Sequence, residues 1–220
     1  MKLPIIEKNK HWLIIDKPPG ISVHNESGDV RSLLKDQLHR GTFHDIYPVH
    51  RLDKETSGLL LVATEQEMAA QLSEQFQTQK AEKSYYAVLR GPMTVSDEWQ
   101  DWATPISDRA EGRKNPQGLL KDRLESLSRF KVLESNKFFS LVEVRLMTGR
   151  QHQIRKHAAL AKHAIVGDSR YGDENYNDKM ATLYGTNRMF LHAFRLTIDL
   201  GKRKQTFETP VPPGFRELFK

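Results

Sequence analysis

Residues 50–58 (HRLDKETSG) bring several reactive side chains together, directly before the apolar run 59–63. A polar loop at the end of a buried strand is a place where a carboxylate can be held ready for reaction. Asp53 could act there as a nucleophile or as a general base. It could equally accept backbone N–H bonds in a turn closed by Thr56 and Ser57, which would be a purely structural role. The segment by itself leaves both interpretations open.

A second dense segment, residues 148–157 (TGRQHQIRKH), is rich in basic and imidazole side chains. At the start of a helix, free N–H groups and cationic side chains would bind phosphate. A solvated basic helix face explains the composition equally well. His152 and His157 have no glutamate between them, lack the spacing of the zinc-protease pattern and point to different helix faces. We therefore expect no metal site here.

The composition excludes further kinds of site. The chain has 220 residues and no cysteine, which removes disulfides, thiolate zinc sites, iron–sulfur clusters and cysteine nucleophiles. It also contains no P-loop, dinucleotide-binding or nucleophile-elbow pattern. The sequence therefore predicts an activity without a cofactor.

The charge is distributed unevenly along the chain. Residues 1–110 carry 13 basic and 16 acidic side chains, whereas residues 111–220 carry 21 basic and 12 acidic ones. A cationic half in a protein with a net charge of +6 is typical of a polyanion partner. A solvated basic surface without a partner would have the same composition, so charge alone does not decide.

Hydrophobic periodicity predicts the elements that must position these segments. Apolar or alternating runs predict strands at residues 12–16, 58–63, 84–89, 139–146, 195–200 and 205–208, the last two joined by a hairpin at 201–202. Helical spacing predicts helices at residues 30–39 and 151–162, and a short helix that follows residues 212–214. Another helix is expected to begin at Thr64, where Glu67 has the spacing of a capping box. Residues 91–108 and 109–129 are expected to be exposed loops. Strands that do not alternate regularly with helices favour an α+β fold.

The length and the apolar runs limit the organisation. A chain of this length is expected to form one domain with its own core. The longest apolar run, residues 59–63, is far shorter than the roughly 20 residues of a membrane span. No signal peptide can be identified at the start. We therefore expect a soluble, cytoplasmic protein.

Taken together, the motifs resemble those of the RluA-type pseudouridine synthases. Residues 50–58 resemble the catalytic H-R-L-D-x-x-T-S-G motif, residues 83–87 (KSYYA) the K-x-Y-x-A motif, and residues 148–157 the T-G-R-x-H-Q-[IL]-R-x-H motif. Residues 16–20 (DKPPG), 167–172 (GDSRYG) and 191–193 (LHA) fit as well, in the right order. The resemblance covers nearly the whole chain, from about residue 11 to residue 210.

The resemblance implies a fold and a domain organisation. The fold would be the α+β pseudouridine synthase fold, in which a mixed, largely antiparallel central sheet is flanked by helices and loops around an active-site cleft. Residues 1–220 would form a single catalytic domain. The N-terminal S4-like domain that many relatives carry would be absent.

The resemblance also assigns the site residues. Asp53 would be the catalytic aspartate, Tyr85 would stack on the target base and assist its deprotonation, and Arg155 would pair with Asp53. The residues expected to bind RNA are Arg51, which would fill the space left by the flipped-out nucleotide, together with His50, Arg150 and His152.

The implied function is the isomerisation of specific uridines in structured rRNA or tRNA. The enzyme would be an intramolecular transferase that acts as a cytoplasmic monomer, without a cofactor, a metal ion or a required protein partner. A non-catalytic RNA-binding or RNA-folding factor on the same scaffold is the main alternative. A glycosidase that uses Asp53 and Glu55 is disfavoured, because the expected distance between the two carboxylates is shorter than the roughly 5–9 Å that such enzymes need.

Overall fold

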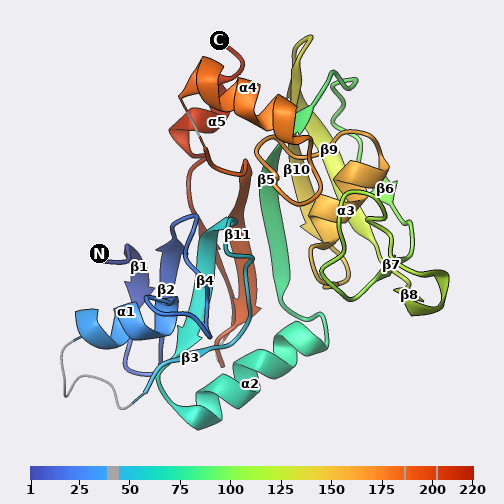
Figure 1. The fold of residues 1–220 in the computed structure, drawn as a ribbon. Coiled ribbons are helices and arrows are strands. Elements are labelled where there is room, and N and C mark those ends of the chain that lie inside the picture. Colours follow the sequence, from blue (N-terminus) through green and yellow to red (C-terminus); the bar gives the residue numbers. More distant parts are fainter. Residues whose placement is uncertain (39–44, 186, 202) are drawn as a thin grey trace. The chain divides into compact units, whose positions relative to one another are not determined.

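The computed structural model describes residues 1–38, 45–185, 187–201 and 203–220 (Figure 1). These residues form two compact units. Unit 1 comprises Met1–Lys83 and Ala193–Pro210, and unit 2 comprises Ser84–His192 and Val211–Lys220. The expectation of a single catalytic domain stays a prediction.

Unit 1 is a sheet with two helices. Its strands are β1 (Ile5–Lys8), β2 (Trp12–Lys17), β3 (Tyr47–Pro48), β4 (Ser57–Ala63), β11 (Leu191–Asp199, which starts in unit 2) and β12 (Lys204–Glu208). The order is β1-β2-β4-β11, with β3 beside β4 and β12 beside β11. The pairs β1–β2, β2–β4, β3–β4 and β11–β12 are antiparallel. The helices are α1 (Val30–Gln37) and α2 (Gln66–Gln77).

Strand β4 forms the centre of this unit, and every one of its residues is buried. A strand covered on both faces needs a continuous apolar run, which explains the sequence of residues 59–63. Leu59 and Leu61 pack in one cluster with Trp12 and Leu72. At Gly58 an added Cβ would lie 2.3 Å from the carbonyl oxygen of Ala193, so only glycine lets the two backbones approach here.

The two helices of unit 1 agree only in part with the helix boundaries predicted from the sequence. α1 begins after Asp29, whose carboxylate accepts the N–H of Ser32 at 2.8 Å, and it confirms the predicted helix up to Gln37. The predicted end of this helix at His39, and Lys202 of the predicted hairpin, lie outside the described residues. The capping box predicted at Thr64 is wrong. α2 begins at Gln66, and the hydroxyl of Thr64 donates to the Lys10 carbonyl at 2.8 Å. A tertiary contact has therefore taken the side chain that local spacing assigned to the cap.

Unit 2 is a second antiparallel arrangement. Its strands are β5 (Glu82–Arg90, which starts in unit 1), β6 (Gln100–Trp102), β7 (Ile106–Ser107), β8 (Arg123–Leu124), β9 (Ser128–Ser135) and β10 (Phe139–Leu146). The order is β5-β10-β9-β6, with antiparallel neighbours, and β7 pairs with β8 in a small separate sheet. The helices are α3 (Gln153–Leu160), α4 (Glu174–Tyr184), α5 (Pro213–Glu217) and the 3₁₀ turn Leu120–Asp122.

These elements confirm the α+β class and the largely antiparallel sheet, and they refine the loops. Residues 91–129, expected to be exposed loops, contain the short strands β6, β7 and β8. Helix α4 was not predicted, although its ends carry standard signals. The Asp173 carboxylate accepts the N–H of Tyr176 at 2.9 Å, and Gly185 adopts the left-handed conformation at the other end.

Across the described ranges, no helix is both long and apolar enough to cross a membrane.

Candidate active site

Asp53 lies half-buried in the turn that leads into β4, at residues 50–56, which we call the Asp53 turn. The N–H of Thr56 donates to the carbonyl of Asp53 at 3.1 Å and closes the turn. Leu52, beside the aspartate, is buried and anchors the turn in the core. The backbone of the turn is thus held from within by a hydrogen bond and by an apolar side chain.

Lys17, at the end of β2, fixes the same turn from a neighbouring loop. Its side chain is 0% exposed, and its ammonium group donates to the carbonyls of Pro18 at 3.0 Å, Ile21 at 2.9 Å and Lys54 at 3.2 Å. The Lys54 carbonyl also accepts the N–H of Gly20 at 2.8 Å. Since Lys54 directly follows Asp53, these bonds fix the backbone from which the Asp53 side chain projects. The DKPPG segment is therefore the support of the Asp53 turn.

His50 and Arg51, both expected to bind RNA, differ in exposure. Arg51 is exposed, whereas the ring of His50 stacks on Phe76 with centroids 4.3 Å apart, and its Nε2 accepts the N–H of Leu61 at 3.0 Å. Burial, and secondarily the charge of Lys83, lowers the pKa of His50 to about 3. The imidazole is therefore neutral and offers no charge to a phosphate. The RNA-binding roles of both residues stay predictions.

Tyr85 lies on β5, opposite Val144 of β10, and is buried. Successive residues of a strand point to opposite faces, so Tyr85 and Tyr86 present their rings on different sides of the sheet. Tyr86 is only half-buried. The assignment of the first tyrosine of the pair as the stacking residue stays a prediction.

Helix α3 is not the solvated basic helix that composition allowed. Its residues from Gln153 to Ala158 are all buried. Buried polar groups need partners, and these have them. The Gln153 amide donates to the Leu127 carbonyl at 2.9 Å and to the Ser128 hydroxyl at 2.8 Å. His157 lies 3.0 Å from the Ser128 hydroxyl and 3.0 Å from the Thr104 carbonyl, and burial lowers its pKa. Much of the motif at 148–157 therefore holds the helix in place.

Lys156 extends this support to the adjoining loop. Its buried ammonium group donates to the carbonyl of Ser107 at 2.8 Å, to the hydroxyl of Ser107 at 3.2 Å and to the carbonyl of Arg109 at 2.7 Å. Burial lowers the pKa of Lys156. The backbone of residues 107–109 is thus fixed to α3.

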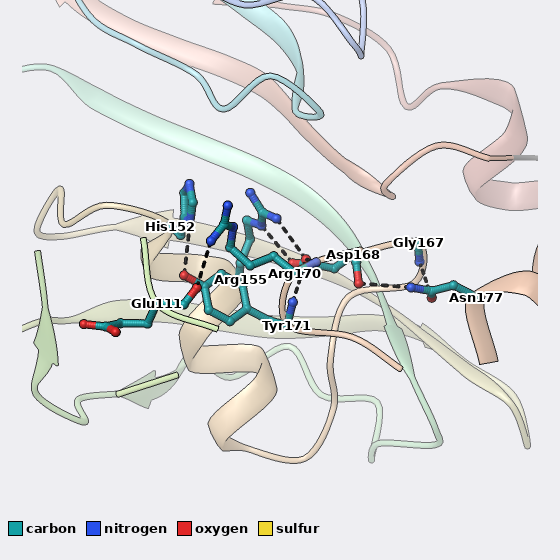
Figure 2. Close-up of polar contacts among 8 residues, drawn as sticks. All are labelled: Glu111, His152, Arg155, Gly167, Asp168, Arg170, Tyr171 and Asn177. Atoms are coloured by element: carbon teal, nitrogen blue, oxygen red, sulfur yellow. Dashed lines mark hydrogen bonds and ion pairs between the residues drawn. The ribbon is translucent and has the colours of Figure 1, made fainter. Parts of the chain in front are cut away.

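Arg155, the third functional residue expected from the motifs, forms a bidentate ion pair with Asp168 (Figure 2). Its Nε lies 2.8 Å from Oδ2 and its Nη2 lies 2.9 Å from Oδ1. The side chains are 3% and 0% exposed. Burial raises the pKa of Asp168, but the bonds from Arg155 and from backbone N–H groups outweigh burial, and the pKa lies below its usual value. Asp168 is therefore ionised at neutral pH.

Asp168 belongs to one of the sequence motifs, but no role was predicted for it. The signal that could have found it is an aspartate between glycines in the segment GDSRYG, where a short turn can aim a carboxylate inward. The predicted pairing of Arg155 with Asp53 stays a prediction, because Asp53 belongs to unit 1 and Arg155 to unit 2.

His152 and Arg155 both contact the side chain of Tyr171. His152 adopts the left-handed conformation with φ of 55° directly before α3, and its Nδ1 lies 3.0 Å from the Tyr171 hydroxyl (Figure 2). The guanidinium carbon of Arg155 lies 5.4 Å from the centre of the Tyr171 ring. Arg150 instead donates from Nε to the carbonyl of Glu125 at 3.3 Å. The structure thus brings His152 and Arg155 together in unit 2.

Among the described residues, no group of three or more His, Asp or Glu side chains is arranged to hold a metal ion. The expectation that the activity needs no metal stays a prediction.

Comparisons with known proteins agree with one another. Residues 11–160 match the family model described as RNA pseudouridylate synthase. The chain is 35% identical over 213 residues to tRNA pseudouridine synthase C of Yersinia pestis, which covers 90% of this chain and 81% of that protein. It is 32% identical over 224 residues to ribosomal large subunit pseudouridine synthase C of Pasteurella multocida, covering 97% of this chain and 66% of that one.

Solved structures give the same result for the fold. Human RNA pseudouridylate synthase domain containing 4 has a TM-score of 0.77 at 26% identity, covering 96% of this chain and 90% of that one. Human RNA pseudouridylate synthase domain containing 1 has a TM-score of 0.77 at 25% identity, covering 95% and 83%. The chain therefore belongs to the RNA pseudouridylate synthase family and is an isomerase that converts uridine in RNA to pseudouridine.

Proposed function

We propose that this enzyme isomerises uridine in structured tRNA or rRNA and that Asp53 is its catalytic carboxylate. One observation carries the assignment of Asp53. The carboxylate stands on a turn whose backbone is fixed by the buried Lys17 and by Thr56, directly before a fully buried strand. Such support suits a group that must meet a substrate in one orientation. Relatives that are named as tRNA and as large ribosomal subunit synthases support both classes of RNA as substrate.

The reaction breaks the N1–C1′ bond of uridine, turns the base and joins C5 to C1′. The proton on C5 is then released and a proton is placed on N1, so the conversion has no net redox change. A carboxylate serves as a nucleophile on C1′ or on the base, or as a base toward a sugar proton. Each of these roles requires Asp53 in its ionised form.

Arg155 and Tyr85 complete the proposed chemistry. A guanidinium favours the ionised form of a carboxylate and fixes its plane, which is the role we assign to Arg155 toward Asp53. The ring of Tyr85 would stack on the flipped uracil and thereby offset part of the cost of unstacking it, a few kcal/mol. Arg51 is exposed on the Asp53 turn, as a side chain that fills the space left by the nucleotide must be.

RNA binding would draw on the basic residues of unit 2 around α3, including Arg150 and His152. The enzyme would act in the cytoplasm as a monomer, without a cofactor or a required protein partner. Because the chain has a net charge of +6, attraction to the RNA backbone would strengthen binding at low salt.

Pseudouridine mapping in cells tests this function. Deleting the gene should remove pseudouridine from one or a few positions in tRNA or rRNA, and the intact gene should restore it. A gene encoding Asp53→Asn should not restore it, whereas Glu55→Gln, two residues away on the same turn, should. Unchanged pseudouridine after deletion, or restoration by Asp53→Asn, would contradict the proposal. A growth or RNA-folding defect that Asp53→Asn repairs without forming pseudouridine would show a non-catalytic RNA-folding factor instead.

A further inference from the structure

We propose that Asp168 is a positioning residue that holds the guanidinium of Arg155 in the orientation that the reaction at Asp53 requires. The inference rests on the proposed function, because it takes Arg155 as the partner of Asp53.

The ion pair between Arg155 and Asp168 is bidentate, and we call this pair of bonds the clamp. Two parallel bonds, 2.8 and 2.9 Å long, join Nε and Nη2 to the two carboxylate oxygens. A single bond would let the guanidinium turn about its own axis, whereas two parallel bonds fix its plane. Since both side chains are buried, water does not compete for the pair. The orientation of Arg155 is therefore set by Asp168.

Asp168 is itself fixed by its own turn. Oδ1, which binds Arg155, also accepts the N–H groups of Arg170 at 2.9 Å and Tyr171 at 3.0 Å. The side chain of Asn177 donates to the Asp168 carbonyl at 3.0 Å (Figure 2). The carboxylate and the backbone of Asp168 are thus held by separate hydrogen bonds that do not involve Arg155.

A close approach in the turn maintains this arrangement. At Gly172 an added Cβ would lie 2.4 Å from the Asp168 carbonyl, so a larger residue would displace the turn. The position of the carboxylate therefore depends on a glycine that is four residues further along the chain.

The same turn reaches two further parts of unit 2. The Tyr171 hydroxyl lies 3.0 Å from His152, and the guanidinium of Arg170 donates to the carbonyls of Ala110 and Glu111 at 3.2 Å each. The turn that holds Asp168 is therefore also attached to the residue before α3 and to the segment at residues 110–111.

Charge explains why an aspartate is needed. A buried guanidinium requires a negative partner, and Asp168 supplies it independently of the substrate and of Asp53. A guanidinium carries more N–H groups than Asp168 engages, so it can bind a second carboxylate along another edge. With Asp168 in place, Arg155 can hold Asp53 while its own charge is balanced.

The test compares Asp168→Asn with the wild type in single-turnover release of tritium from [5-³H]uridine RNA. Asparagine keeps the shape of aspartate but loses its charge and presents an N–H₂ group to one guanidinium nitrogen. We expect the rate on saturating RNA to fall about 100-fold, as a small misplacement of a reacting group does, with RNA affinity changed less than about 3-fold. Asp173→Asn is the matched control, because Asp173 also pairs with an arginine, Arg113, but is only half-buried at the start of α4, and it should retain the wild-type rate.

A double-mutant cycle separates positioning from a general structural role. In the Arg155→Lys background, which cannot form the clamp, Asp168→Asn should lower the rate less than about 3-fold further. Equal losses in both backgrounds, or a wild-type rate for Asp168→Asn alone, would overturn the inference. If Asp168→Asn does not fold, Asp168→Glu, which keeps the charge but shifts it, should fold and show a reduced rate with normal RNA affinity; a wild-type rate for it would also overturn the inference. Turnover by Asp53→Asn in the same assay would instead refute the proposed function.

Discussion

The turn that carries Asp53 and the helix that carries Arg155 are fixed in different ways. The Asp53 turn is held through its backbone, by the ammonium group of Lys17 on the Lys54 carbonyl and by the N–H of Gly20 on the same oxygen. Arg155 is held through its side chain, by the buried carboxylate of Asp168. The backbone of the Asp53 turn is thus fixed by hydrogen bonds to its carbonyls, whereas the guanidinium of Arg155 is fixed by an opposite charge.

Each of the two regions contains a buried lysine. Lys17 and Lys156 each direct an ammonium group at backbone carbonyls, but Lys17 secures the Asp53 turn, whereas Lys156 secures residues 107–109 beside α3. The same chemical device therefore supports a reacting group in unit 1 and a loop in unit 2. Replacing each lysine by methionine should separate these two uses.

Of the two lysine replacements, Lys17→Met should have the larger effect. Methionine fills the space of the side chain but leaves the carbonyls of Pro18 and Ile21 without the ammonium donor, at a cost of about 1–3 kcal/mol for each buried group. The Asp53 turn should shift, and the single-turnover rate should fall about 100-fold while RNA affinity stays the same. Urea unfolding, filter binding and tritium release measure the three quantities. A loss of stability without a loss of rate would show that Lys17 supports the fold alone.

Lys156→Met should have the opposite effect, because it should weaken RNA binding and leave the rate unchanged. The segment at Ser107 and Arg109 would lose its attachment to α3, so RNA affinity should fall by about 10-fold, the equivalent of about 1.4 kcal/mol. The rate on saturating RNA should stay close to that of the wild type. A variant that binds RNA normally but reacts slowly would place Lys156 with Lys17 as a support of the reacting groups.

Acid stability compares one buried histidine from each unit. Burial is the main cause that lowers the pKa of His50 to about 3 and of His192 to about 4. The unfolded chain binds these protons near pH 6.5, before the folded chain does, so stability is lost as the pH falls below about 6.5. Each histidine should contribute a loss of about 1.4 kcal/mol per pH unit until its folded pKa is reached. Urea unfolding between pH 7 and pH 5 should show this slope, and His50→Gln should reduce it; an unchanged slope in that variant would contradict the low pKa of His50.

The smallest effect should come from the exposed charges. Lys121→Ala removes a cation from the basic half of the chain, and it should make the log–log slope of RNA affinity against salt less steep by about 0.7. Lys8→Ala, at an exposed position of β1 in the acidic half, is the matched control and should leave the slope unchanged. Equal changes in both variants would mean that RNA does not distinguish the two halves.

The difference between the two regions also explains what the sequence could predict. The Asp53 turn is local: the polar residues, the following apolar strand and the glycine at 58 are contiguous, so periodicity and turn chemistry identified strand β4 and the position of Asp53. The support of Arg155 is not local. Its partner Asp168 lies beyond the end of α3, and no spacing rule connects a helix residue with a turn in the next loop.

The burial of α3 and the cap of α2 were equally hard to predict. Basic side chains usually indicate a solvated face, but Lys156 and His157 are buried because carbonyls and hydroxyls of neighbouring segments satisfy them. Thr64 and Glu67 had the spacing of a capping box, yet Thr64 binds the Lys10 carbonyl instead. In each case the deciding partner is distant in sequence, which local patterns cannot reveal.

Single-turnover tritium release from [5-³H]uridine RNA by the purified Asp53→Asn variant tests the catalytic role of Asp53 most directly. The variant should bind RNA as the wild type does and should release tritium at least about 10⁴-fold more slowly, as expected when a reacting group is removed. Glu55→Gln should react at a rate close to that of the wild type. An Asp53→Asn variant that folds, binds RNA and releases tritium at the wild-type rate would show that Asp53 is not the catalytic carboxylate.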